Sequence, residues 1–177
     1  MRRPAHATPP STNRRARRPW AAAIRIAAFL LTVGGCVVVG AHGNVTPQAV
    51  DTTGLEPLGD AWRDVNPYSG NAKAVEIGSS GFNQNCARCH GLEAISGGIA
   101  PDLRRLDNDC APMADKAAQA ACVKDNDDYF LTTVRHGRSR NGAVYMPPFE
   151  GVLTQEAFWA IKSWLETRRE KPLAGQP

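Results

Sequence analysis

The sequence contains two cysteines separated by two residues and followed directly by a histidine, in the segment CARCH at residues 86–90. On one turn of a helix, positions i, i+3 and i+4 lie on the same side. Cys86 and Cys89 can therefore bond the two vinyl groups of one porphyrin as thioethers, while His90 presents an imidazole nitrogen to its iron. This spacing predicts covalent attachment of one haem, around which the rest of the chain would fold.

A CxxC pair also occurs in redox-active proteins and in zinc sites. A thioredoxin-like pair is expected beside a βαβ pattern, and no such pattern surrounds residues 86–90. A four-ligand zinc site needs a second matching pair, but Cys110 and Cys122 are too far apart in the sequence to form one. Haem attachment is therefore the favoured interpretation.

The charge of the chain is unevenly distributed. Its 177 residues carry a formal net charge of +4, yet residues 1–43 contain seven arginines and no acidic residue. The remaining chain has 14 basic and 17 acidic side chains, which is a net charge of −3. The basic balance of the whole chain therefore gives no reason to expect a nucleic-acid partner.

The N-terminal residues resemble an export signal. An arginine-rich segment at 1–20 precedes a mostly apolar run at 26–39, which is shorter than a typical membrane-spanning helix. The small residue Gly43 predicts cleavage after that position, and hence a signal peptide at 1–43. We therefore expect export to the periplasm, with the membrane contacted only transiently through the signal. Two alternatives stay open: an uncleaved membrane anchor, and a lipoprotein modified at Cys36.

Composition divides the expected mature chain into three parts. Residues 44–70 hold many helix breakers but also large apolar residues, and we expect an N-terminal extension that lies across the domain surface, with one short helical turn at 60–64. Residues 71–170 show helical periodicity and are predicted to form the haem domain, followed by a C-terminal tail at 171–177.

Three helices are expected in the haem domain. The first spans about residues 72–86, and its glycines, Gly78 and Gly81, would let another helix cross closely. The second starts with an acidic first turn at 125–128, and the third starts after Thr154. A calcium site is the alternative role of the acidic run, although its spacing does not follow an EF-hand loop.

A haem iron bound by His90 has a second axial position. Met146 is the favoured ligand, because Met/His ligation is a known c-type arrangement and raises the reduction potential. It lies in the segment YMPPF at 145–149, where two prolines stiffen the chain and oppose helix formation. Met113 and His136 are the rival ligands, and core packing is the alternative role of Met146 itself.

An iron-bound imidazole normally donates its other N–H to a nearby acceptor, which fixes the orientation of the ring. Pro101 follows His90 closely in the sequence, and its carbonyl oxygen is the candidate acceptor. The alternative is an ordinary turn proline.

Two further cysteines, Cys110 and Cys122, belong to the expected mature chain. In an oxidising compartment an even leftover pair predicts a disulfide. It would close a loop of 12 residues and contribute roughly 2–3 kcal/mol on a chain-entropy estimate. The alternative is two free buried thiols.

Three motifs together carry a family resemblance: CARCHG at 86–91, APDL at 100–103, and MP at 146–147 before an aromatic-rich last helix. Over residues 71–170 the chain resembles a class I cytochrome c. The resemblance implies an all-α fold with helices around one covalently bound haem c. It also implies that His90 and Met146 are the axial ligands of the iron.

A narrower resemblance rests on NPY at 66–68, NQNC at 83–86, GGIAP at 97–101 and the insertion that carries Cys110 and Cys122. These features are similar to periplasmic cytochromes that accept electrons from PQQ-dependent alcohol dehydrogenases, and in particular from ethanol dehydrogenase. The resemblance, and not the composition or spacing, implies this partner.

The sequence favours an electron carrier over an enzyme. With both axial positions filled, a substrate cannot reach the iron, and no acid/base constellation is evident around an open site. The expected acceptor of the electrons is a downstream respiratory protein such as a terminal oxidase. Two alternatives stay open: a haem enzyme or gas sensor with a labile sixth ligand, and a membrane-anchored cytochrome subunit of an oxidase.

Overall fold

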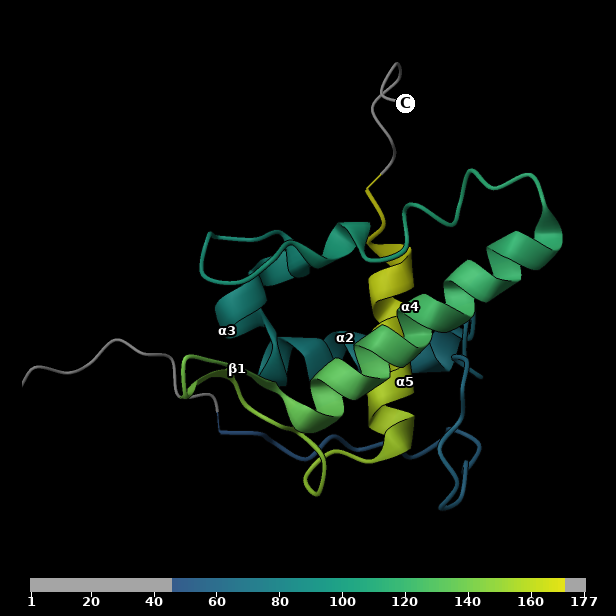
Figure 1. Cartoon of the computed structure of the whole chain (residues 1–177). Coiled ribbons are helices and arrows are strands. Elements are labelled where there is room, and N and C mark those ends of the chain that lie inside the picture. The colour runs from purple at the N-terminus through teal and green to yellow at the C-terminus, as the bar shows by residue number, and fades with distance from the viewer. Residues whose placement is uncertain (1–45, 171–177) are drawn as a thin grey trace, which may run out of the picture. The chain divides into compact units, whose positions relative to one another are not determined.

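Helices account for most of the regular structure in residues 46–170, the part of the chain that the computed structural model describes (Figure 1). The elements follow one another as α2 (Ala72–Asn85), α3 (Ala87–His90), the 3-10 turns η1 (Leu92–Ala94) and η2 (Leu103–Arg105), α4 (Lys116–His136), β1 (Arg138–Arg140), β2 (Ala143–Met146) and α5 (Gln155–Thr167). The expected signal peptide, the first two residues of the extension and the C-terminal tail lie outside the described residues.

Polar side chains cap the three longer helices at their first residues. Asn71 precedes α2 and Asp115 precedes α4, and each accepts hydrogen bonds from the backbone N–H groups two and three residues further on. Thr154 precedes α5 and accepts from the N–H three residues on. Each side chain satisfies donors that a helix N-terminus leaves without an intrahelical partner. The start of the last helix is therefore where the sequence predicted it.

Helices α2 and α5 cross at close range, as the two glycines of α2 predicted (Figure 1). A Cβ atom at Gly78 would lie 1.9 Å from the carbonyl oxygen of Ala160, so only glycine allows this approach. The rings of Phe82 and Trp164 pack beside the crossing, with centroids 4.5 Å apart. This crossing fixes the position of the end of α2, from which the CxxCH segment continues.

Helix α4 begins at Lys116, well before the acidic run at 125–128 that was expected to form its first turn. That expectation is wrong, because the alanine-rich segment AAQAA has high helix propensity and Asp115 caps it. The acidic run lies inside the helix. Asp127 is buried there and pairs with Lys162 of α5, Oδ1 to Nζ, at 3.0 Å.

A short antiparallel hairpin, β1–β2, modifies the expected all-α architecture. Its two-residue turn is Asn141-Gly142, and both residues have positive φ, 52° and 78°. Asn-Gly is the strongest short-range signal for such a turn, so the sequence did contain a signal for this hairpin. Met146 is the last residue of strand β2.

The extension from residue 46 to residue 70 contains neither helix nor strand, so the expected turn at 60–64 is wrong. It packs against α5: the backbone N–H of Leu58 donates to Glu156 Oε1 at 2.9 Å, and the ring of Trp62 stacks on Phe158 at 6.0 Å. Because the extension covers one side of α5, all residues of that helix from Ala157 to Leu165 are buried. No helix within residues 46–170 is long and apolar enough to cross a membrane.

Candidate functional site

A cavity of about 210 Å³ lies beside the CxxCH segment. A single buried water needs only about 10–15 Å³ on the same measure, so the cavity suits a much larger group. Apolar side chains form most of its wall. Those from α2, α4 and α5 are Phe82, Phe130, Val134, Phe158, Ile161 and Leu165. Such a wall favours an apolar ligand with few polar groups.

The CxxCH residues form the helical turn that the spacing predicted. The backbone N–H groups of Cys89 and His90 both donate to the carbonyl oxygen of Cys86, at 3.1 and 3.0 Å. Cys86 and His90 line the cavity, and Cys89 lies between them on α3 without being part of the wall. The sulfurs of Cys86 and Cys89 are not bonded to each other.

The Cys86 thiol lies in surroundings that oppose a redox role. Burial, and to a smaller extent the neighbouring Cys89, raises the pKa of the Cys86 thiol to about 12. A reactive CxxC pair depends on a thiolate, and hence on a lowered pKa. The raised pKa therefore argues against the thioredoxin-like alternative and is compatible with a cysteine whose sulfur forms a thioether.

The imidazole of His90 has a defined orientation. Its Nδ1 lies 2.9 Å from the carbonyl oxygen of Pro101, which also lines the cavity. Because a carbonyl oxygen only accepts, Nδ1 must carry the proton in this hydrogen bond. In the neutral ring with this tautomer, Nε2 carries the lone pair that a metal ligand requires.

The loop that carries Pro101 is held by several internal contacts. Ser96 Oγ donates to the carbonyl oxygen of Ala100, and Asp102 accepts from the backbone N–H of Arg104 at 3.0 Å. Hydrogen bonding from the Arg104 side chain is the main cause that lowers the pKa of Asp102 to about 2. The carboxylate therefore stays charged at neutral pH and keeps this turn closed beside His90.

Met146 lines the same cavity as His90, from strand β2. The backbone of Gly137 approaches it closely: a Cβ on this glycine would lie 2.4 Å from the carbonyl oxygen of Met146. His136 and Met113, the two rival ligands, do not line the cavity, and His136 Nδ1 instead lies 3.5 Å from Glu150 Oε2. Of these three candidate residues, only Met146 lines the same cavity as His90 and can bind the same cofactor.

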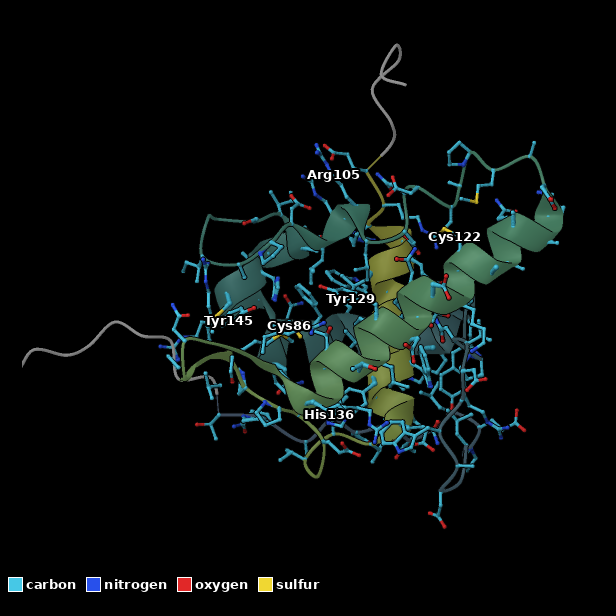
Figure 2. All side chains as sticks on the ribbon, viewed as in Figure 1. Cys86, Arg105, Cys122, Tyr129, His136 and Tyr145 are labelled. Carbon is cyan, nitrogen blue, oxygen red and sulfur yellow. A yellow bond between two sulfur atoms is a disulfide. The ribbon has the colours of Figure 1, made fainter. Side chains whose placement is uncertain are left out.

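Cys110 and Cys122 form a disulfide in the structure. The bond ties the segment before α4 to the first half of that helix, and neither residue lines the cavity. Figure 2 shows Cys122 far from Cys86 and Tyr145, which lie at the cavity end of the domain. The disulfide is therefore a structural link and no part of the candidate site.

Sequence reasoning missed four polar residues on the cavity wall: Tyr129 and Thr133 of α4, and Arg138 and Tyr145 of the hairpin. Periodicity identifies buried apolar faces, but it does not identify polar side chains at the rim of a ligand site. The Asn-Gly turn was the available signal, because it folds β1 back onto β2 beside Met146.

No group of three or more His, Cys, Asp or Glu side chains within residues 46–170 is arranged to hold a metal ion. The acidic run at 125–128 is helical, so its side chains point in different directions around the axis. The described residues therefore offer no support for a calcium site there.

The chemistry of this donor set fits a haem. A large apolar cavity suits the porphyrin, two cysteines on one turn suit its vinyl groups, and an imidazole and a thioether suit its iron. A small helical protein with these features belongs to the class of c-type haem proteins.

Comparison with known proteins identifies the family. The family model described as cytochrome C oxidase, cbb3-type, subunit III matches residues 73–165. Cytochrome c550 of Pseudomonas aeruginosa is 53% identical over 131 residues, which cover 72% of this chain and 81% of that protein. The quinohemoprotein alcohol dehydrogenase ADH-IIG of Pseudomonas putida is 29% identical over 100 residues, which cover 56% of this chain and 11% of that protein. No solved structure matches the chain.

The chain belongs to the class I c-type cytochromes. It is accordingly a single-haem electron carrier with a covalently bound haem c, and not an enzyme. The class I fold expected from the sequence is confirmed, with the β1–β2 hairpin as an addition to its helices.

Proposed function

We propose that this protein is a periplasmic electron carrier in which Cys86 and Cys89 bind the haem as thioethers, while His90 and Met146 bind its iron. The main support is that His90 and Met146 line one cavity from two separate elements, α3 and β2. When bound, the haem supplies reversible one-electron chemistry. The chain supplies both axial ligands, the apolar wall and the fixed orientation of the His90 ring.

Filling both axial positions distinguishes a carrier from a haem enzyme or gas sensor. A thioether in the sixth position leaves no site for a substrate or a gas. Gly137 supports this arrangement, because its close contact with the Met146 backbone limits movement of the ligand away from the cavity. The apolar wall disfavours the more highly charged oxidised state and so raises the reduction potential.

We further propose a PQQ-dependent alcohol dehydrogenase as the electron donor and a respiratory protein, such as a terminal oxidase, as the acceptor. Two observations support the donor. The sequence resembles cytochromes that serve such enzymes, and part of the chain is similar to a segment of a quinohemoprotein alcohol dehydrogenase. That segment makes up only 11% of the dehydrogenase, so the similarity does not extend to the rest of that enzyme.

The donor is tested by mixing the oxidised mature protein with a purified PQQ-dependent ethanol dehydrogenase and following the haem absorbance. Reduction is expected only when both enzyme and ethanol are present. A PQQ-dependent glucose dehydrogenase with glucose serves as the matched control and should reduce the protein much more slowly. Equal rates with the two enzymes would reject the specific donor while leaving the carrier function in place.

Axial ligation by Met146 is tested with Met146→Ala. Loss of the thioether should lower the reduction potential and let the reduced protein bind carbon monoxide, because the sixth position becomes open. Met113→Ala is the control, since Met113 does not line the cavity and its removal should change neither property. Carbon monoxide binding by the unaltered protein would instead favour the haem enzyme or sensor.

A membrane-anchored oxidase subunit is the second candidate function, because the matching family model is described as a subunit of a cytochrome oxidase. The alignment with cytochrome c550 favours a free carrier, since it covers 81% of that small protein. Cell fractionation together with the mass of the mature protein distinguishes the two. Recovery in the periplasmic fraction with residues 1–43 removed supports the carrier, and recovery in the membrane fraction at full mass supports the subunit.

A further inference from the structure

Arg138 is the first residue of β1. Within residues 46–170 it is the one Lys or Arg residue that lines the cavity. It is half-buried, and none of the ion pairs among these residues includes it. The one carboxylate on the same wall, Asp102, is already paired with Arg104 at 2.8 Å. The cavity therefore presents a guanidinium for which the described residues supply no counter-ion.

Two neighbours hold the Arg138 side chain in place. Its Nη2 donates to Thr133 Oγ1, and its guanidinium carbon lies 5.0 Å from the centroid of the Tyr129 ring. Both neighbours also line the cavity. The Cα of Arg138 is paired with that of Met146 across the hairpin, so the cation lies close to the proposed axial ligand in the fold.

A half-buried cation at an apolar cavity is costly unless an anion pairs with it. A guanidinium has five N–H donors in a planar fork, and Thr133 accepts one of them. The remaining donors match the two oxygens of a carboxylate. Haem carries two carboxylates, its propionates, and they are the ionised groups on the edge of an otherwise apolar porphyrin.

We propose that Arg138 binds a propionate of the haem and thereby raises the reduction potential. The reduced haem carries one more electron than the oxidised haem. A fixed positive charge beside the cavity, which also offsets the negative propionate, stabilises the reduced form more strongly. Arg138 is thus a positioning residue for the cofactor, a role that depends on haem filling this cavity and not on which dehydrogenase donates electrons.

The test compares Arg138→Gln with Arg140→Gln in the haem-bearing mature protein. Arg140 lies on the same strand, is exposed and does not line the cavity, so it controls for the loss of one charge from the hairpin. Arg138→Gln should shift the reduction equilibrium about tenfold toward the oxidised form. For one electron this lowers the reduction potential by about 59 mV. Arg140→Gln should shift it by much less, and Arg138→Lys should restore most of the loss.

A second measurement does not need a variant. In the unaltered holoprotein with isotope-labelled haem, the Arg138 side chain should show nuclear Overhauser contacts to a propionate methylene group. Absence of such contacts would overturn the proposal, even if Arg138→Gln failed to retain haem.

If Arg138 instead bound an acidic partner protein, the two variants would give a different result from the one expected for propionate binding. In that case Arg138→Gln would slow electron transfer and change its salt dependence, while the potential of the isolated protein would stay at the unaltered value. An unchanged potential, or equal shifts for Arg138→Gln and Arg140→Gln, would show that Arg138 does not bind the propionate.

Discussion

The two faces of helix α5 are both buried, but they meet different kinds of surroundings. One face carries Phe158, Ile161 and Leu165, which line the haem cavity. The other carries Lys162, 1% exposed, and Glu166, which join a cluster of charged side chains. In the proposed site the apolar face is completed by the haem, whereas the charged face is completed by the chain itself.

The charged cluster joins four separate parts of the fold. Lys162 Nζ lies 3.2 Å from Asp107 Oδ2, 3.0 Å from Asp127 Oδ1 and 3.6 Å from Glu166 Oε1. Arg169 Nη2 also pairs with Asp107, at 2.6 Å. The extension adds Asn66, whose backbone N–H donates to Asp127 and whose side chain donates to Glu166.

Ionisation in this cluster follows from its pairing. Burial acts to lower the pKa of Lys162, but the carboxylates of Asp107 and Asp127 outweigh it and the pKa is raised. Burial acts to raise the pKa of Asp107, but Arg169 and Lys162 outweigh it and the pKa is lowered. Lys162 and Asp107 therefore stay charged at neutral pH. The cluster links the extension and α4 to α5 without any cofactor.

The comparison predicts that loss of haem affects one face far more than the other. Cys86→Ala combined with Cys89→Ala removes both thioether sulfurs, and the exported protein should lack covalently bound haem. The apolar wall would then surround an unfilled cavity, which is costly in a close-packed interior. Hydrogen exchange should show large loss of protection around α3 and the hairpin, and a smaller loss around Lys162.

The matched control replaces the other cysteine pair. Cys110→Ser combined with Cys122→Ser should retain haem and its absorbance, since neither residue lines the cavity. Uniform loss of protection in the haem-free protein, including residues near Lys162, would show that the two faces do not differ in their dependence on haem.

The next largest effect is expected from the charged face. Lys162→Met keeps the length of the side chain but leaves three carboxylates, those of Asp107, Asp127 and Glu166, with one fewer cation. Removing one partner of a buried ion pair costs about 3–5 kcal/mol, a large part of the 5–15 kcal/mol typical of a domain. Chemical unfolding of the haem-bearing protein measures this loss.

Lys116→Met is the control for this variant, because Lys116 is exposed in the first turn of α4 and touches no member of the cluster. Its free energy of unfolding should change by less than about 0.5 kcal/mol. Similar losses in the two variants would mean that the buried pairing contributes little to stability.

The same two faces differ in how well the sequence predicts them. Phe158, Ile161 and Leu165 follow a helical period, so the sequence pattern alone indicates that they share one face. Lys162 carries a charged head that normally lies in water, and only the fold brings Asp107 and Asp127 to it. Buried polar contacts between distant segments leave no periodic trace in the sequence.

The residues of the proposed haem site also differ in how well the sequence predicts them. The CxxCH spacing, Pro101 and Met146 were predicted from local motifs, and the structure brings Cys86, His90, Pro101 and Met146 to one cavity. The start of α4 was mispredicted because an acidic run resembles a first turn, while the true cap, Asp115, lies in a segment that the disulfide constrains. Arg138 was missed because its relation to the cavity depends on the hairpin.

A smaller effect, which is present at neutral pH and is lost in acid, should come from Asp107. Its pKa in the folded protein is below the usual value of 3.8, so its contribution to stability is present above that value and is lost as the pH falls through the folded pKa. Asp107→Asn has no such carboxylate. The variant should be less stable than the unaltered protein at pH 6, and the difference should narrow as the pH falls below 4.

Asp60→Asn provides the control, since Asp60 is exposed in the extension and does not touch the cluster. It should retain the acid dependence of the unaltered protein. A constant difference between Asp107→Asn and the unaltered protein from pH 6 to pH 3 would show that Asp107 ionisation does not contribute.

The smallest effect tests the apolar face without removing the haem. Ile161→Val deletes one methylene group from a side chain that is 3% exposed and lines the cavity, which should cost about 0.5–1.5 kcal/mol in chemical unfolding at any pH. Val152→Ala removes more carbon from a residue that is 44% exposed and should cost less than about 0.5 kcal/mol. If Ile161→Val were as harmless as Val152→Ala, the haem cavity would have to tolerate loose packing. The apolar face of α5 would then not need close contact with the cofactor, and the proposed difference between the two faces would be wrong.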